Sequence, residues 1–280
     1  MKKPITTEEF SSILAETLSI VFQSSRKMTP AELGKILSDK FSINRHNVKS
    51  IIQKLIRREE LIYTYQYGLT FLERSFSKPA RISSKVILTP VNRPYLPTPN
   101  EVVIKIMDGA SFGAGDHPTT RLAIKSIEHA LTHSDLSKHP KSVCLDIGTG
   151  SGVLAITAIQ LGINTGLGID IDPNAISEAK NNVSLNHLNH RITIRNVPVE
   201  LLTEPYFLIM ANLRYPTLIQ LSSDIFRLLE NDGFFVMSGF RMDELPAIID
   251  EYTYRGFDSV WIEEEKGWGS ITITKKPVKP

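Results

Sequence analysis

A glycine-rich segment near the middle of the chain constrains the fold more than any other feature. An apolar run that begins at Val143 leads into Asp146-Ile147-Gly148-Thr149-Gly150-Ser151-Gly152, and a second apolar run follows from Val153. Glycines at this spacing allow a tight turn between a buried strand and a helix, and they let a ligand approach the backbone closely. The segment therefore predicts a strand, a loop and a helix of a nucleotide-binding α/β sheet.

A second acidic residue at the end of an apolar run supports this prediction. Asp170 ends the run Thr165-Gly166-Leu167-Gly168-Ile169, 22 residues after Gly148. In nucleotide-binding α/β sheets, an acid about 20 residues beyond the glycine loop binds ribose hydroxyls. The two features together favour a nucleotide site over a glycine turn without a ligand.

The spacing of the glycines indicates which nucleotide to expect. Dinucleotide sites usually show Gly-x-Gly-x-x-Gly and place a pyrophosphate at the helix N-terminus. Here the glycines stand at 148, 150 and 152, and Asp146 precedes them. A carboxylate beside the loop repels a pyrophosphate, whereas it suits the cationic amino-acid end of S-adenosylmethionine. The sequence therefore favours S-adenosylmethionine over a nicotinamide dinucleotide.

Charge and proline content divide the chain into two modules. Residues 1–90 carry 15 Lys and Arg against 8 Asp and Glu, while residues 91–280 carry 17 against 22. Prolines remove backbone donors and disfavour helices and central strands, and they gather between the modules at 79, 90, 94, 97 and 99. We predict a small basic domain over 1–76, a linker over 77–100 with room for one strand at 81–88, and a larger domain over 101–280.

The basic domain shows the pattern of three helices and a hairpin. Apolar residues have helical spacing over 7–22, after the cap at Thr29, and over about 44–58. Two β-rich runs, 61–65 and 69–72, flank a turn that contains Gly68. This order resembles a winged helix-turn-helix domain. The outward residues of its third helix would be Arg45, His46, Lys49, Gln53, Lys54 and Arg57.

The third helix has more than one interpretation. In DNA-binding winged helices such side chains reach phosphates and base edges. The candidate nucleic-acid contacts are Arg45, Lys49, Lys54 and Arg57. A merely solvated polar face, or a module for protein docking or dimerisation, fits the same pattern.

Six motifs in order carry a resemblance to a known family. The most specific is Phe112-Gly113-Ala114-Gly115-Asp116-His117-Pro118-Thr119-Thr120. The others are residues 145–156, residues 168–175, Met210-Ala211-Asn212-Leu213, Met237-Ser238-Gly239-Phe240 and Lys266-Gly267-Trp268. On these motifs, residues 102–276 resemble the ribosomal protein L11 methyltransferase (PrmA) family, which is one of the class I methyltransferases.

The resemblance implies a fold, a cofactor and a substrate class. The fold would be a Rossmann-like α/β sheet, preceded here by the small winged-helix-like domain. The cofactor would be S-adenosyl-L-methionine, and the acceptor a protein amine, a lysine or an N-terminal α-amine, with a ribosomal protein as partner. By motif position, the cofactor-binding residues would be Phe112, Gly113, Thr120, Asp146, Gly148, Gly150, Asp170, Ile171 and Asn212.

Two residues are candidates for a catalytic role. Methyl transfer mainly needs alignment and a deprotonated nucleophile, because the sulfonium already supplies the electrophile. Asn212, at a predicted strand end, can orient an amine through its side-chain carbonyl. His117 either accepts a proton or orders its own loop by hydrogen bonding.

The chain also departs from the family pattern. The winged-helix-like module replaces the family's N-terminal recognition domain, so the substrate is the least transferable property. Phe207 stands where the family usually has an acid at the start of the fourth strand. No acid follows the third strand, so Asn196 or a backbone group would contact the adenine amino group.

Three other functions fit parts of the sequence. Asn212-Leu213-Arg214-Tyr215 has the outline of the Asn-Pro-Pro-Tyr motif of nucleic-acid amino methyltransferases, in which the aromatic ring stacks on a flipped base. Such an enzyme would dock through the basic module. A small-molecule O-methyltransferase would dimerise through that module, and a regulator would bind the cofactor only as a signal.

Composition limits the compartment and the cofactor types. Cys144 is the single cysteine, which excludes a disulfide framework and a multi-cysteine metal site. No stretch approaches the roughly 18 uninterrupted apolar residues of a membrane span, and the polar start is unlike a secretory signal. We therefore expect a cytoplasmic protein without a metal site or membrane association.

Overall fold

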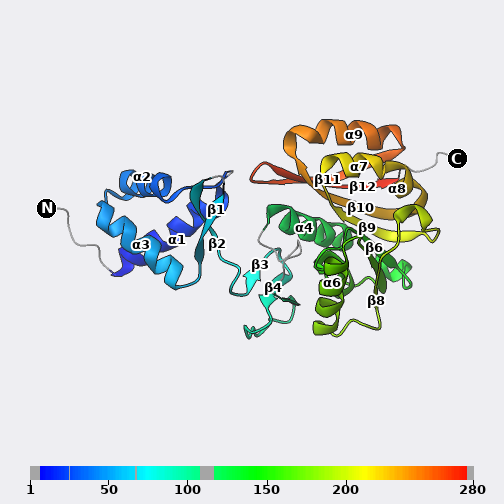
Figure 1. Ribbon diagram of the computed structural model, residues 1–280, viewed down its shortest axis with the longest axis horizontal. Coiled ribbons are helices and arrows are strands. Elements are labelled where there is room, and N and C mark those ends of the chain that lie inside the picture. Colours follow the sequence, from blue (N-terminus) through cyan, green and yellow to red (C-terminus); the bar gives the residue numbers. More distant parts are fainter. Residues whose placement is uncertain (1–6, 25, 67, 108–116, 276–280) are drawn as a thin grey trace. The chain divides into compact units, whose positions relative to one another are not determined.

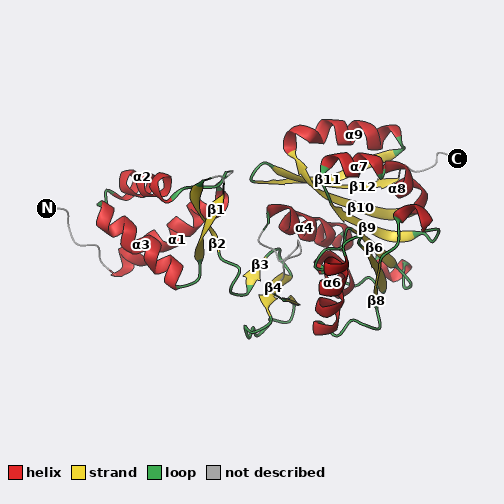
Figure 2. Ribbon diagram, in the orientation of Figure 1, coloured by secondary structure: helices red, strands yellow, loops and turns green. Residues whose placement is uncertain are grey.

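The computed structural model describes residues 7–24, 26–66, 68–107 and 117–275, and it divides the chain into two compact units. The first unit is Met1–Lys78 and the second is Pro79–Pro280. Figure 1 shows the elements along the chain and Figure 2 their type.

The first unit contains three helices followed by a hairpin. The helices are α1 (Thr7–Gln23), α2 (Pro30–Phe41) and α3 (Arg45–Arg57). The strands β1 (Leu61–Gln66) and β2 (Leu69–Arg74) pair antiparallel. Thr29 caps α2 reciprocally with Glu32, whose backbone N–H donates to the threonine hydroxyl while its carboxylate accepts from the Thr29 N–H.

The core of the first unit explains why these helices pack together. Each helix places apolar residues at helical spacing on one side, and these side chains are buried against one another. On α3 the buried residues are Val48, Ile51, Ile52 and Leu55. The opposite side of α3 is left for polar and charged residues.

The second unit is built around a seven-stranded mixed sheet, which confirms the predicted α/β fold. Its strands are β6 (Val143–Ile147), β7 (Thr165–Ile169), β8 (Ile192–Arg195), β9 (Tyr206–Asn212), β10 (Leu229–Arg241), β11 (Phe257–Glu265) and β12 (Trp268–Lys275). Their order is β11-β12-β10-β9-β6-β7-β8, and only the pairs that include β12 are antiparallel. The carboxyl ends of β6 to β10 therefore share one edge.

Helices cover both faces of this sheet. One layer contains α4 (Pro118–Thr132), α5 (Val153–Gln160) and α6 (Pro173–Leu185), and the other α7 (Tyr215–Gln220), α8 (Ser222–Leu228) and α9 (Leu245–Tyr254). Short 3₁₀ turns lie at Leu136–Lys138, Val199–Leu201 and Met242–Glu244. The order of strands and helices is that of a doubly wound sheet, whose ligands bind outside the carboxyl ends of the strands.

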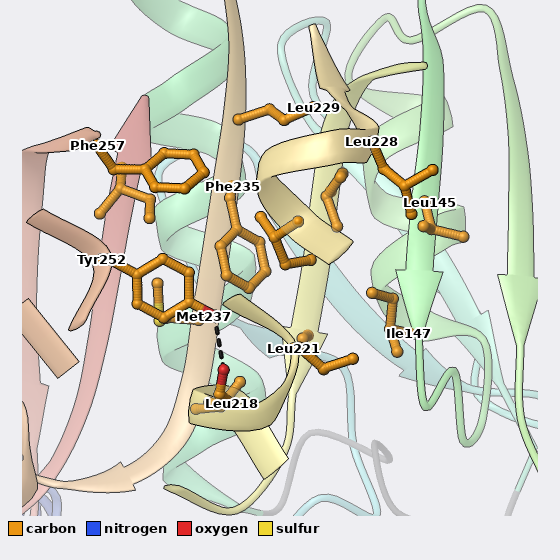
Figure 3. Close-up of a cluster of buried hydrophobic side chains, with 14 of the residues drawn as sticks. Leu145, Ile147, Leu218, Leu221, Leu228, Leu229, Phe235, Met237, Tyr252 and Phe257 are labelled. Atoms are coloured by element: carbon orange, nitrogen blue, oxygen red, sulfur yellow. Dashed lines mark hydrogen bonds between the residues drawn. The ribbon is translucent and has the colours of Figure 1, made fainter. Parts of the chain in front are cut away.

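The core beneath α7, α8 and α9 fixes β9 and β10. Figure 3 shows Phe235 and Met237 of β10 among side chains from these helices and from β6. The Tyr252 hydroxyl is buried there and donates to the Leu218 carbonyl oxygen at 2.7 Å. Because side chains alternate along a strand, the next residue, Ser238, faces the opposite layer, where its hydroxyl donates to Thr119 O.

The segment expected to be a linker differs in the structure. It contains β3 (Ala80–Arg81) and β4 (Val86–Pro90), which form a three-stranded sheet with β5 (Val102–Ile106). The carboxylate of Glu128, on α4, accepts from the Lys85 N–H at 3.0 Å and from the hydroxyls of Ser83 and Ser84. The apolar residues of β4 are buried. Irregular backbone is limited mainly to residues 91–99, where several of the prolines lie. Most of 77–100 therefore belongs to the second unit.

Candidate functional site

A cavity of about 690 Å³ lies at the carboxyl ends of β6, β7, β8 and β9. This volume is within the range of pockets that bind nucleoside-sized ligands. The lining residues come from the ends of these four strands and from the elements that follow. They are Ile147, Gly148, Thr149, Gly150, Val153, Leu154, Ile169, Asp170, Ile171, Asp172, Ala175, Val197, Pro198, Val199, Glu200, Asn212, Leu213 and Thr217.

The glycine loop forms one wall of the cavity. Gly148 and Gly152 have φ angles of 68° and 81°, in the left-handed region that favours glycine. A Cβ atom on Gly148 would lie 2.6 Å from Leu213 Cδ2, and one on Gly152 would lie 3.3 Å from the Cβ of Ala179 on α6. Both the turn and the close packing of its neighbours therefore require these glycines.

Asp146 lies beneath the loop and is not part of the cavity lining. Its side chain is fully buried, and Oδ2 accepts hydrogen bonds from Thr149 Oγ1 at 2.7 Å and from the Ala155 N–H at 3.2 Å. Its other oxygen, Oδ1, is buried without a hydrogen-bond partner. The carboxylate thus holds the loop to the start of α5. The sequence predicts that it also holds the amino-acid end of the ligand, directly or through water, and this role stays a prediction.

Burial raises the pKa of the Asp146 carboxyl to about 6, against the lowering effect of the Thr149 hydrogen bond. Because the folded-state pKa exceeds the unfolded one, the folded protein binds the extra proton as pH falls toward 5. We expect the free energy of unfolding of the wild type, relative to Asp146→Asn, to increase by about 1 kcal/mol between pH 7 and pH 5. Urea unfolding of both proteins across this range measures the difference, and parallel pH profiles would contradict the expectation.

Asp170 and Ile171 follow β7 and lie at the cavity. The Asp170 carboxylate accepts from the Gly150 N–H at 2.9 Å and from the Asp172 N–H at 3.0 Å, so it is held in one orientation beside the glycine loop. Ile171 is 86% exposed. A ligand base that covered this side chain would remove apolar surface from water.

Asn212 ends β9 at another side of the cavity. Its Nδ2 makes a long contact of 3.5 Å with Oγ1 of Thr120, which is itself buried on α4. Its Oδ1 is buried with no hydrogen-bond partner. A buried carbonyl oxygen without a donor costs free energy, and a ligand N–H would satisfy it.

His117 is the N-cap of α4. Its Nδ1 accepts from the Thr119 N–H at 3.3 Å and lies 2.8 Å from Thr119 Oγ1, and its ring meets Trp268 edge-on with the centroids 5.0 Å apart. Two roles are predicted for His117, accepting a proton or ordering its own loop, and these contacts fit the second. They place the start of α4, and therefore Thr120, beside Asn212.

Salt bridges and hydroxyl pairs hold α4 against the sheet. The guanidinium of Arg121 donates to the carboxylate of Glu265, with Nε at 3.0 Å from Oε1. Ser126 Oγ lies 2.7 Å from Ser270 Oγ in the buried contact with β12. These contacts fix the position of Thr120 relative to the end of β9.

The site predicted from the sequence leaves out part of the cavity lining, and two of its residues have no described position. Phe112 and Gly113 lie outside the described residues. Among the missed residues are Val197, Pro198, Glu200, Leu213 and Thr217. The sequence signal available for them is that they lie within five residues after the end of a predicted strand.

Two of the departures from the family pattern have simple structural accounts. Asn196 is exposed and absent from the lining, and the wall beyond β8 consists of Val197, Pro198, Val199 and Glu200. Phe207 is buried and packs edge-on against Phe234 and beside His139. It lies at the start of β9, away from the cavity at the strand's end.

The described residues contain neither a candidate metal cluster nor a candidate membrane-spanning helix. The described part of the chain holds no group of three His, Cys, Asp or Glu side chains arranged to bind a metal ion. None of its helices combines the length and the apolar character that crossing a bilayer requires.

The second unit is similar to known proteins. The model of the family "Ribosomal protein L11 methyltransferase (PrmA)" matches residues 73–276. The ribosomal protein L11 methyltransferase of Geotalea daltonii is 31% identical over 73% of this chain and 66% of its own length. That of Exiguobacterium sibiricum is 34% identical over 72% of this chain and 62% of its own length.

A solved structure agrees with the sequence relatives. The crystal structure of a ribosomal protein L11 methylase from Lactobacillus delbrueckii subsp. bulgaricus superposes with a TM-score of 0.64 and 27% identity, over 71% of this chain and all of that one. The chain spans 63–66% of the length of the first three curated relatives it matches. Since the family model covers well over half of the chain, the chain belongs to the ribosomal protein L11 methyltransferase (PrmA) family.

Proposed function

We propose that the protein is an S-adenosylmethionine-dependent methyltransferase that modifies a protein amine. The observation that carries this proposal is the position of Asn212. Its buried and unpartnered Oδ1 belongs to a residue that lines the same cavity as the glycine loop and Asp170. The residues suited to a nucleotide and the unpartnered Oδ1 of Asn212 thus lie at the same edge of the sheet.

The residues present fit S-adenosyl-L-methionine. Asp170 offers a held carboxylate suited to ribose hydroxyls, and Ile171, Val197 and Pro198 offer apolar surface suited to a purine. Gly148 and Gly150 let the amino-acid end approach the backbone. When bound, S-adenosylmethionine supplies a methyl group on an electrophilic sulfonium.

Each side chain of the site then has a defined task. Asn212 Oδ1 accepts an N–H of the incoming amine and thereby fixes the direction of the nitrogen lone pair. Thr120 holds the Asn212 amide through its contact with Nδ2. Asp146 holds the glycine loop from below through its hydrogen bond with Thr149. His117 keeps the α4 end in place.

A ribosomal protein is the proposed acceptor because the relatives are named for ribosomal protein L11. The test incubates the purified full chain with tritiated S-adenosylmethionine and lysate from a strain that lacks this gene, with and without nuclease. We expect label in a nuclease-resistant protein band that comigrates with ribosomal protein L11. Absence of label from all protein bands, together with measured S-adenosylhomocysteine binding, would reject the protein acceptor while leaving the cofactor site intact.

A nucleic-acid amine is the second candidate acceptor, and one observation weighs against it. Tyr215 is half-buried and packs against the core beneath α7, so its ring already has an apolar partner. Label that disappears on nuclease treatment would favour this candidate. A small-molecule O-methyltransferase would label neither fraction, and a regulator would show binding without turnover.

The first unit is proposed to be a winged helix. Three helices followed by an antiparallel hairpin support this assignment. The proposed compartment is the cytoplasm, where the buried Cys144 stays a thiol.

A further inference from the structure

The outward side of α3 carries charge that the proposed methyl transfer does not use. The family match begins at residue 73, so α3 lies outside it. Arg45, Lys49, Lys54 and Arg57 are all exposed, and the helix contains no Asp or Glu. Its apolar residues face the core of the first unit, so the cations occupy the opposite side.

These four cations are not neutralised by the first unit itself. Its ion pairs within the described residues join Arg26 to Glu32, Lys27 to Glu73, Lys40 to Glu16 and Lys78 to Glu60. All of these pairs lie off α3. Within the described residues, the ion pairs of this unit therefore do not involve the cations of α3, and the outward side of the helix carries net positive charge.

The shape of α3 suits the major groove of duplex DNA. A helix of 13 residues is about 20 Å long at a rise of ~1.5 Å per residue. Its diameter of roughly 10–12 Å matches the ~12 Å width of the B-form major groove, whereas the major groove of A-form RNA is too narrow for side chains to read. Exposed Gln53 adds an amide that can pair with base edges.

Other partners fit this surface less well. The apolar residues of α3 are buried, so the helix offers no apolar face for a bilayer. The exposed side also lacks Phe, Tyr and Trp rings on which single-stranded bases could stack, although the hairpin exposes Tyr65 at 75%. We propose that the outward side of α3, defined by Arg45, Lys49, Lys54 and Arg57, is a docking surface for double-stranded DNA.

Salt dependence tests the proposal directly. The full chain is titrated onto a fluorescein-labelled 20-base-pair DNA duplex of mixed sequence, and anisotropy is followed between 50 and 200 mM NaCl. Four phosphate contacts give a slope of about −3.6 in log K against log salt, which is a loss of roughly 150-fold over this range. The double variant Lys49→Gln/Lys54→Gln should reduce the slope by about 1.8 and bind more weakly at 50 mM.

A matched variant separates this surface from general charge. Lys141→Gln/Lys180→Gln removes the same charge from exposed positions of the second unit. It should leave both the affinity and the slope unchanged. All four lysines are exposed, so both double variants should stay folded. Circular dichroism and S-adenosylhomocysteine binding check this for each variant.

Three results would overturn the assignment. They are no binding at 50 mM NaCl, an equal loss in the two double variants, and equal competition by an RNA duplex or by polyglutamate at matched charge. The last result would assign the surface to RNA or to an acidic protein. None of these results depends on whether methyl transfer is observed, so this proposal and the proposed function fail separately.

Discussion

Replacing Asn212 with alanine should lower the rate of methyl transfer by about 10²-fold, since misplacement of a reacting group by about 1 Å costs this much. The substitution removes the buried Oδ1 that has no partner in the protein and would orient the acceptor nitrogen. It leaves the glycine loop and Asp170 in place, so the affinity for S-adenosylhomocysteine should change by only a few-fold. Single-turnover transfer and calorimetric binding measure the two quantities.

Asn181→Ala is the matched control for this experiment. Asn181 is exposed on α6 and absent from the cavity lining, so its loss should change neither quantity. A loss of cofactor affinity as large as the loss of rate would mean that Asn212 acts in cofactor binding alone. An unchanged rate would reject its role in orienting the acceptor.

Local motifs carried most of what could be predicted about this site. The glycine loop and the acid after the next strand are set by short-range backbone geometry, and both line the cavity as expected. The family assignment was also predictable from six short motifs, and the family model confirms it. The contacts of Phe112 and Gly113 stay predictions.

Features that depend on long-range packing were harder to predict. Asp146 was expected to hold the cationic amino-acid end of the cofactor, directly or through water, because its carboxylate precedes the glycine loop. Only the fold reveals that Thr149 and Ala155 provide hydrogen-bond donors beneath the loop. Likewise, the prolines between 79 and 99 suggested a linker, but the Glu128 carboxylate on α4, distant in sequence, binds the Lys85 N–H just before β4.

Gly239 illustrates a residue whose importance follows from such a long-range contact. It has a φ of 95° and lies where the register between β10 and β12 shifts, which is a β-bulge. A Cβ atom there would lie 2.3 Å from the Leu213 carbonyl oxygen and 2.9 Å from the Leu213 nitrogen. Leu213 directly follows Asn212, so the backbone that Gly239 contacts lies next to the candidate catalytic residue.

Gly239→Ala should therefore destabilise the second unit and displace Asn212. Left-handed backbone costs about 1–2 kcal/mol for a residue with a Cβ, and forcing atoms into a packed region adds roughly 1–3 kcal/mol. The clash is with backbone, so it cannot be relieved by rotating a side chain. We expect a free energy of unfolding lower by about 2–5 kcal/mol and a slower methyl transfer.

Gly267→Ala isolates the effect of the clash. Gly267 has a φ of 75°, but the nearest atom to a Cβ there is Arg241 Nη1 at 3.8 Å. This variant bears the backbone cost without the collision, so it should lose only about 1–2 kcal/mol. Denaturant unfolding of both variants gives the difference. Equal losses in the two proteins would mean that the Leu213 backbone accommodates the methyl group, and the end of β9 would then be less rigid than the bulge suggests.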